Sequence, residues 1–338
     1  MATQSFFRAA AAATVALMFA AGTSAVPPQS SQQPDEDQRT ETFKVSVEVV
    51  NLFFNVKDKK GALIPALTRD DFEVLEDGKP QTIKYFAAEA NQPLTLGLLV
   101  DTSGSQGRVL PMEQEVGAAF LKEVLREKDL AFLISFDVNV DLLQDYTSSP
   151  RELKAALERT RINTGGGFST GIPGIGGGPI PQSHPPRGTL LYDAIYLAAD
   201  EKLRSEVGRK AMIILTDGND QGSRMSLRDA VEAAQKADTI CYVLLIADRG
   251  FYAQGEYVGD SEMKRLAEET GGRVVNVGNK YEKLKQAFDQ IAQELRSQYN
   301  IGYTPTNTNR DGGFRKVEVR SRQGHRIQAR KGYYAPRG

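Results

Sequence analysis

Residues 94–105 have the sequence LTLGLLVDTSGS, in which an apolar run ends in a turn crowded with oxygen-bearing side chains. Mostly apolar residues between Pro93 and the Gly/Ser turn predict a strand that is buried on both faces. The strand then presents Asp101, which is followed by the hydroxyl groups of Ser103 and Ser105. Carboxylate and hydroxyl oxygens suit Mg²⁺, Mn²⁺ or Ca²⁺ better than softer metals. The stretch therefore predicts a site for a hard cation at the carboxyl end of a buried strand.

Two further segments carry side chains of the same chemistry. One is GTLLYD at residues 188–193, and the other is TDG at residues 216–218, after the strand-like AMIILT. Together with the first turn they resemble the metal-ion-dependent adhesion site of von Willebrand factor type A domains. The resemblance implies that a divalent cation, Mg²⁺ or else Mn²⁺ or Ca²⁺, is held by Asp101, Ser103, Ser105, Thr189 and Asp217. It also implies an open coordination position, which an Asp or Glu of a protein partner would complete.

Three other interpretations of the first turn stay open. The turn can simply cap the helix that follows it, in a fold that has lost its metal site. A Mg²⁺-dependent phosphohydrolase of the haloacid dehalogenase type also places an Asp at the end of its first strand, but it needs a second Asp two residues later, where this chain has Ser103. A structural envelope protein with an inactive metal site is the third. The leading hypothesis is a non-enzymatic adhesion or protein-binding module without catalytic residues.

Composition excludes several classes of function. The 338 residues are 40% hydrophobic and 25% charged, which is typical of a globular protein of about two domains. A formal net charge of −1 gives no general attraction to nucleic acid or membrane, so we expect neither as a partner. One Cys and two His leave no material for a zinc site or for Cys/His catalysis.

The first residues predict export. Residues 1–25 combine Arg8, an apolar stretch and the small-residue sequence Thr23-Ser24-Ala25, which is the pattern of a secretory signal peptide. Residues 26–42 are polar and rich in Pro and Gln, and predict a disordered linker. No later segment is long and apolar enough to span a membrane. We therefore expect a secreted protein, periplasmic or extracellular.

Residues 91–297 alternate strands and helices, which predicts a doubly wound, mostly parallel α/β sheet. The predicted strands are 94–100, 130–136, 211–216, 239–247 and 273–277, with 138–145 as an antiparallel edge. The predicted helices are 111–125, 150–160, 190–205, 226–237, 261–270 and 281–297. In such folds ligands bind at the carboxyl ends of the strands, where the strand order reverses. Asp101 and Asp217 both fall at that edge.

The two ends of the chain are β-rich. Asp77-Gly78 predicts a hairpin turn between strands 72–76 and 82–86, and residues 314–321 and 325–335 predict two more strands. Segments 43–90 and 298–338 are each too small to fold alone, so we expect them to pair into a β-sandwich-like domain that holds the α/β domain as an insertion. The whole chain, through DFEVLEDGKPQ, YNIGYTP and RKGYY, resembles an exported bacterial family related to type A domains and common in acidobacteria.

Two segments next to these elements have open roles. The Gly/Pro-rich residues 164–188 lead directly to Thr189 and form either a rim of the metal edge or a tolerated surface insertion. The helix 281–297 leads directly into strand 299–303. In type A domains that switch, ligand capture is accompanied by a shift of the last helix, and the resemblance suggests the same here. The alternative is a helix fixed by its apolar face.

Other candidate residues are predicted to have structural or solvated roles. We expect His184 and His325 on the surface, and Asp220 bonded to the loop backbone. The many Lys and Arg residues after residue 310 predict a solvated sheet face, with edge-protecting charges.

Overall fold

The computed structural model describes residues 49–88, 92–163, 188–246 and 259–338. The predicted signal peptide, the linker, His184 and all of the Gly/Pro-rich segment except Gly188 lie outside these residues. Among the described residues, no helix is long and apolar enough to cross a membrane.

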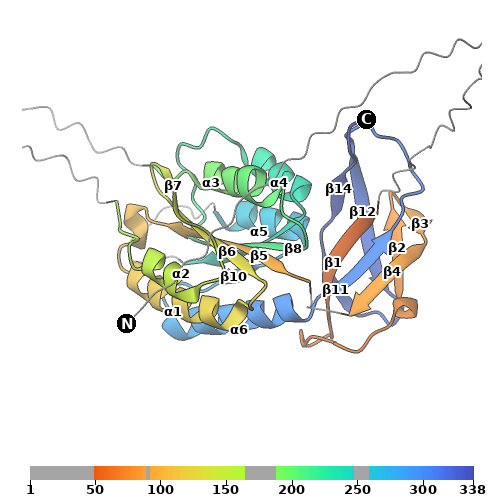
Figure 1. Cartoon of the computed structure of the whole chain (residues 1–338), viewed down its shortest axis with the longest axis horizontal. Helices are drawn as coiled ribbons and strands as arrows, with labels where there is room; N and C mark the ends of the chain where they lie inside the picture. Colours follow the sequence, from red (N-terminus) through yellow and green to blue (C-terminus); the bar gives the residue numbers. More distant parts are fainter. Residues whose placement is uncertain (1–48, 89–91, 164–187, 247–258) are drawn as a thin grey trace, which may run out of the picture. The chain divides into compact units, whose positions relative to one another are not determined.

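A six-stranded sheet forms the centre of the α/β domain, in the order β10-β9-β8-β5-β6-β7 (Figure 1). Its strands are β5 (Leu94–Asp101), β6 (Leu130–Phe136), β7 (Val140–Thr147), β8 (Arg209–Thr216), β9 (Thr239–Leu245) and β10 (Val274–Asn276). All neighbours are parallel except β7, which pairs antiparallel with β6 at the edge. All eight residues of β5 are buried, as expected for a strand between parallel neighbours and under helices on both faces.

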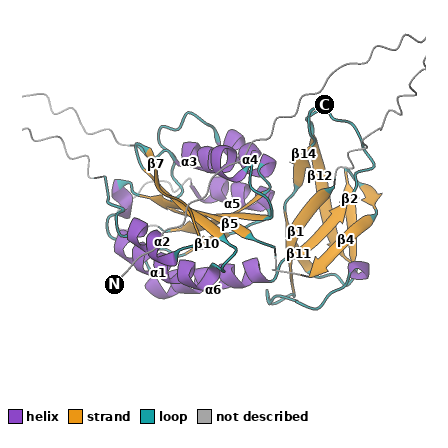
Figure 2. Cartoon of the chain, viewed as in Figure 1, coloured by secondary structure: helices purple, strands orange, loops and turns teal. Residues whose placement is uncertain are grey.

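Helices cover both faces of this sheet (Figure 2). One core layer packs α1 (Leu110–Val124), α2 (Pro150–Leu157) and α6 (Tyr281–Arg296) on the sheet, and it contains Leu96 and Leu98 of β5. The other packs α3 (Leu191–Leu197), its π-helical continuation Ala198–Leu203, α4 (Leu227–Lys236) and α5 (Gly259–Thr270). The predicted doubly wound α/β class is confirmed.

The chain order of the strands places a switch point beside β5. From β5 the chain passes to β6 on one side, and later to β8 on the other side. Asp101 ends β5, and Asp217 follows β8 directly. Both carboxylates therefore lie where the strand order reverses, which is the usual ligand position in open α/β sheets.

Both chain ends build two further four-stranded sheets, in the orders β13-β1-β11-β4 and β14-β12-β2-β3. The strands are β1 (Val50–Lys57), β2 (Phe72–Glu76), β3 (Lys79–Gln81), β4 (Ile83–Ala88), β11 (Tyr299–Tyr303), β12 (Phe314–Ser321), β13 (Arg326–Ala329) and β14 (Gly332–Tyr334). β1 pairs with β11 and β13, and β2 pairs with β12, so each of these two sheets joins residues from both ends. Phe54 and Phe72, 5.1 Å apart between ring centroids, belong to the shared core.

The predicted strand 82–86 is present as β4, but its predicted hairpin pairing is wrong, and the predicted strand 325–335 is broken in two. In both places the chain passes from one sheet to the other. The Asp77-Gly78 turn is present, with positive φ at both residues, but its partner strand is β3 and ends at Gln81. The Gln81 side chain holds this corner through two hydrogen bonds with Thr306, both of 3.0 Å, and β4 then pairs with β11. Likewise residues 325–335 divide into β13 and β14, because Lys331 N–H donates to the Glu269 carbonyl at the break.

Candidate metal centre

Asp101 is the innermost group of the predicted site. Its side chain is fully buried at the end of β5. One carboxylate oxygen accepts the Ser103 N–H at 2.9 Å, and the other accepts the Thr216 hydroxyl at 2.8 Å. Since Thr216 is the last residue of β8, the carboxylate is fixed both by the turn that follows it and by the neighbouring strand.

Three more predicted ligands form a continuous chain of hydrogen bonds with this turn. The hydroxyl oxygens of Ser103 and Ser105 are 3.0 Å apart, and the Ser105 hydroxyl donates to Asp217 at 2.6 Å. The other carboxylate oxygen of Asp217 accepts the Asn219 N–H at 3.0 Å. Gly218 has φ +84°, a backbone conformation that favours glycine and explains the Asp-Gly sequence at this bend.

The fifth predicted ligand, Thr189, reaches the same edge from a different loop. Its N–H and carbonyl both pair with Gln221, at 2.9 Å, and Leu190 N–H donates to the Asp137 carbonyl at 2.8 Å. Asp137 follows β6 and Gln221 lies after β8, so the segment crosses the end of β5 between them. Within the described residues, the Thr189 hydroxyl makes no hydrogen bond to the other four predicted ligands. The fold therefore gathers all five at one edge, four of them in direct contact.

Acidic side chains gather at this edge. Burial, together with repulsion from the nearby Asp217 carboxylate, raises the pKa of Asp101 to about 7. Burial also raises the pKa of Glu113, with added repulsion from Asp101 and Asp217. In the described part of the chain, no ion pair with Lys, Arg or His involves Asp101 or Glu113. A bound divalent cation would relieve this repulsion.

The donor set fits a hard divalent cation. Within the described ranges, no three His, Cys, Asp or Glu side chains cluster tightly enough to hold a metal ion by themselves. The predicted site does not require such a cluster, because three of its five donors are hydroxyl groups of Ser and Thr. The position where a haloacid dehalogenase type enzyme needs its second Asp is Ser103, whose hydroxyl pairs with Ser105. The role of the five residues as metal ligands stays a prediction.

Sequence reasoning missed two residues of this edge. Thr216 was predicted only as the end of a strand. Its hydroxyl group lies directly before the Asp-Gly pair, and this position could have indicated a role at the site. Glu113 lies three residues before Val116, on the buried face of α1, and an acid within an apolar helical stripe is such a signal. Asp220 has the predicted structural role, because it accepts the Tyr192 N–H at 3.1 Å.

The basic residues at the C-terminus are less uniformly solvated than predicted. Arg315 is buried and pairs with Asp311 at 2.8 Å, and Arg330 pairs with Asp238 and donates to the Asn51 carbonyl. Both guanidinium groups are therefore held in place by partners within the fold. His325 is half-buried and bonds to Gln323.

The sequence matches no protein-family model and no curated protein. Among solved structures, BatB from Bacteroides thetaiotaomicron aligns with 19% identity and a TM-score of 0.44, over 60% of this chain and 98% of that chain. A von Willebrand factor type A protein from Catenulispora acidiphila aligns with 12% identity and a TM-score of 0.44, over 86% and 73%. Proximal thread matrix protein 1 from the mussel byssus, described with a zinc-occupied MIDAS motif, aligns with 14% identity and a TM-score of 0.46, over 65% of this chain and 50% of that one.

The α/β domain has the von Willebrand factor type A fold. Six strands in the observed order, one antiparallel edge strand, and helices on both faces define this fold, and the predicted recognition is confirmed at that level. The narrower resemblance to an exported acidobacterial family stays a prediction, as does the exact position of the domain boundaries.

Proposed function

We propose that this protein is a non-enzymatic binding module that captures an acidic side chain of a partner protein through a divalent cation. The observation that carries the proposal is the buried carboxylate of Asp101, bonded to Ser103 and Thr216, and continuous through hydroxyl groups with Asp217. When bound, Mg²⁺ or Mn²⁺ would supply the positive charge that attracts a carboxylate ligand.

The residues of the chain have distinct parts in this function. Asp101, Ser103, Ser105, Thr189 and Asp217 would hold the ion, while Thr216 and the Ser103 N–H fix the orientation of the Asp101 carboxylate. Because hydroxyl groups and only two carboxylates form the predicted donor set, the ion would keep attraction for one more anionic ligand. This is the chemistry required to recognise an Asp or Glu side chain.

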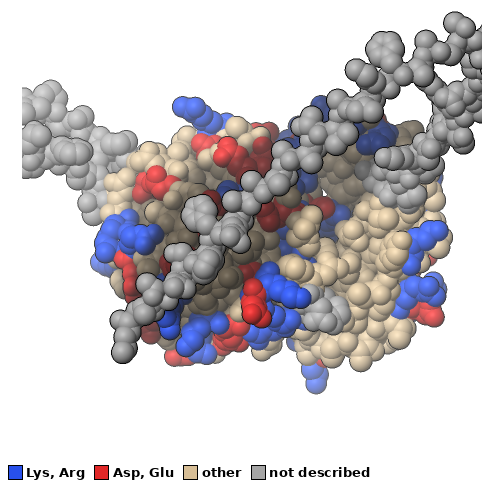
Figure 3. Space-filling model, viewed as in Figure 1, with Lys and Arg blue, Asp and Glu red and all other residues tan. Residues whose placement is uncertain are grey.

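Selectivity for a partner would come from this edge rather than from the overall charge. Basic and acidic side chains are interspersed over the face shown in Figure 3, in line with a formal net charge of −1. We also propose that the protein acts outside the cytoplasm, on the basis of the N-terminal sequence pattern.

Calorimetric titration with Mg²⁺ and Mn²⁺ tests the cation site directly. We expect one dominant site in the wild-type protein and none in Asp101→Ala, because that change removes a predicted ligand at the carboxyl edge of the sheet. Asp289→Ala, which changes an exposed Asp that pairs with Lys285, is the matched control and should bind like the wild type. Unchanged binding in Asp101→Ala would falsify the assignment.

A second experiment tests capture of a partner. Immobilised protein is exposed to an envelope extract in Mg²⁺ and eluted with a chelator, in parallel with immobilised Asp101→Ala. We expect proteins that elute with chelator from the wild-type column and are missing from the variant column. Identical elution from both columns would exclude metal-dependent capture.

A further inference from the structure

Glu113 is an unusual residue for the interior of α1. It is fully buried, on a helix face it shares with Val116 and Phe120. Neither of its carboxylate oxygens has a hydrogen-bond partner among the described residues. A buried carboxyl group without a partner costs free energy that an apolar residue in its place would not. A structural role in the core therefore does not explain this side chain.

The packing of α1 on β5 places Glu113 next to the cation edge. One turn further along the helix, a Cβ atom at Gly117 would lie 3.9 Å from Leu98 of β5. α1 follows β5 in a right-handed crossover, so it runs back along the strand, and one helical turn towards its start spans about 6 Å. That distance equals about two strand residues. Glu113 therefore lies near the level of Val100, directly behind the Asp101 turn.

A second side chain near this turn also has an oxygen that is unpaired within the described residues. The side-chain carbonyl oxygen of Gln106 is also buried without a hydrogen-bond partner in the described ranges, while its amide donates to the Ile246 carbonyl at 3.3 Å. Together with the two carboxyl oxygens of Glu113, the segment after the turn therefore has three buried oxygens without a hydrogen-bond partner in the described ranges. Groups that donate hydrogen bonds or carry positive charge would satisfy them. A hydrated divalent cation provides both.

We propose that Glu113 is a sixth acidic or hydroxyl group of the cation site, where its carboxylate holds the hydrated ion from the inner side of the Asp101 turn. The inference rests on the proposed function and extends it. A third carboxylate raises the charge around the ion, so it favours divalent over monovalent cations. Glu113 would raise the affinity of the site for the ion, because its carboxylate attracts the hydrated ion while the five predicted ligands keep their places.

Replacement of Glu113 by its neutral isostere provides the test. Mn²⁺ and Mg²⁺ affinities are measured by calorimetry for wild type, Glu113→Gln and the matched control Glu115→Gln, which makes the same change on the exposed face of the same helix. We expect Glu113→Gln to weaken binding by about tenfold or more, and Glu115→Gln by less than about twofold. In chelator, Glu113→Gln should unfold at the same temperature as the wild type or higher, because it removes a buried carboxylate.

The outcomes separate this inference from the proposed function. Absence of binding in the wild type, or full binding in Asp101→Ala, would overturn the proposed function and the role of Glu113 together. Wild-type affinity in a folded Glu113→Gln, with binding abolished in Asp101→Ala, would overturn only the role of Glu113. If Glu113→Gln does not fold, Glu113→Met repeats the measurement with an apolar side chain of similar length. The same loss of affinity supports the inference, and wild-type affinity overturns it.

Discussion

Two buried carboxylates of this protein, Glu294 on α6 and Glu113 on α1, have opposite surroundings. Lys57 and Arg273 both donate to the same oxygen of Glu294 at 2.8 Å, and Gln328 donates to the other oxygen at 3.3 Å. Its backbone carbonyl accepts a further hydrogen bond from Asn55. The side-chain carboxyl group of Glu113 has no hydrogen bond and no ion pair with any described residue. Both side chains are nearly inaccessible to solvent, so burial alone does not distinguish them.

The two carboxyl groups differ in whether the fold itself supplies their counterions and hydrogen-bond donors. A buried ion is tolerated when the fold supplies its counterions and fills its remaining hydrogen-bonding positions, as the chain does at Glu294. At the carboxyl edge of the large sheet, the chain places Asp101 and Glu113 without such counterions among the described residues. In the function proposed above, a bound cation supplies the missing counterion, and its binding would stabilise the folded state by mass action.

The largest predicted effect is the loss of the Glu294 charge. Glu294→Gln leaves Lys57 and Arg273 close together and mostly buried, so we expect the free energy of unfolding to fall by about 3 kcal/mol. Chemical denaturation in chelator measures it. Glu123→Gln is the control, because its pair with Arg296 is exposed and should contribute less than about 1 kcal/mol. A loss in Glu294→Gln no larger than in the control would contradict the structural role of this network.

Asp101→Asn should not lower the free energy of unfolding in chelator, in contrast to Glu294→Gln. At pH 7 in chelator, we expect the free energy of unfolding to stay unchanged or rise by about 1 kcal/mol, because the repulsion from Asp217 is lost while an acceptor oxygen remains. With Mg²⁺ at a hundred times its dissociation constant, the wild type should gain about 2.7 kcal/mol and the variant nothing. A destabilisation in chelator like that of Glu294→Gln would remove the contrast between the two sites.

The sequence allowed most of the α/β domain to be predicted, because its strands and helices are long and strongly patterned. β5 and β6 match the predicted strands 94–100 and 130–136 within one residue, and α2 begins at Pro150 as predicted, after Ser149, which accepts the Glu152 N–H. The short strands were harder. β3 and β14 have three residues each, and side-chain contacts with distant segments decide where the chain leaves one sheet for the other.

The candidate site was predictable in its residues and not in its surroundings. The turn after β5 and the Asp-Gly pair after β8 are local patterns, whereas the contact of Ser105 with Asp217 joins residues 112 positions apart. The Glu294 network was missed for the same reason, because Lys57 lies 237 residues away in the chain. Pairing of distant charges depends on the tertiary fold, and no local periodicity reports it. The predicted shift of α6 on ligand binding stays a prediction.

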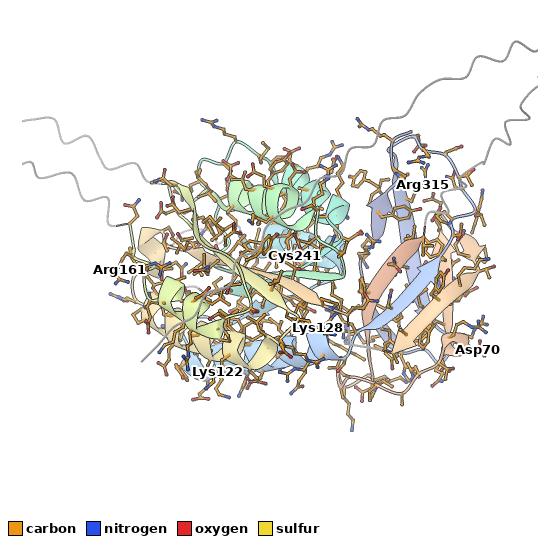
Figure 4. The ribbon with its side chains drawn as sticks, viewed as in Figure 1. Asp70, Lys122, Lys128, Arg161, Cys241 and Arg315 are labelled. Carbon is orange, nitrogen blue, oxygen red and sulfur yellow. The ribbon has the colours of Figure 1, made fainter. Side chains whose placement is uncertain are left out.

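The smallest predicted effect concerns Cys241 of β9, labelled in Figure 4. Burial raises the pKa of its thiol to about 12, so at pH 8 almost no reactive thiolate forms. We expect no measurable alkylation of the native wild type or Asp101→Asn over hours, and complete alkylation in denaturant.

Contacts with Gly271 and Gly272 connect Cys241 to the Glu294 network. A Cβ atom at Gly272 would lie 1.9 Å from the Cys241 carbonyl oxygen. The carbonyl of the preceding Gly271 accepts the Gln328 amide, which also donates to Glu294.

The thiol therefore reports opening beside the Glu294 network and not at the cation edge. Because labelling follows the population of open molecules, Glu294→Gln should accelerate it measurably, while chelator or Asp101→Asn should leave it unchanged. Mass spectrometry of the alkylated protein at fixed times gives the rates, and the single cysteine of the chain provides only one thiol to label. Faster labelling in Asp101→Asn than in Glu294→Gln would show that the metal edge, rather than the ion network, holds this part of the sheet closed.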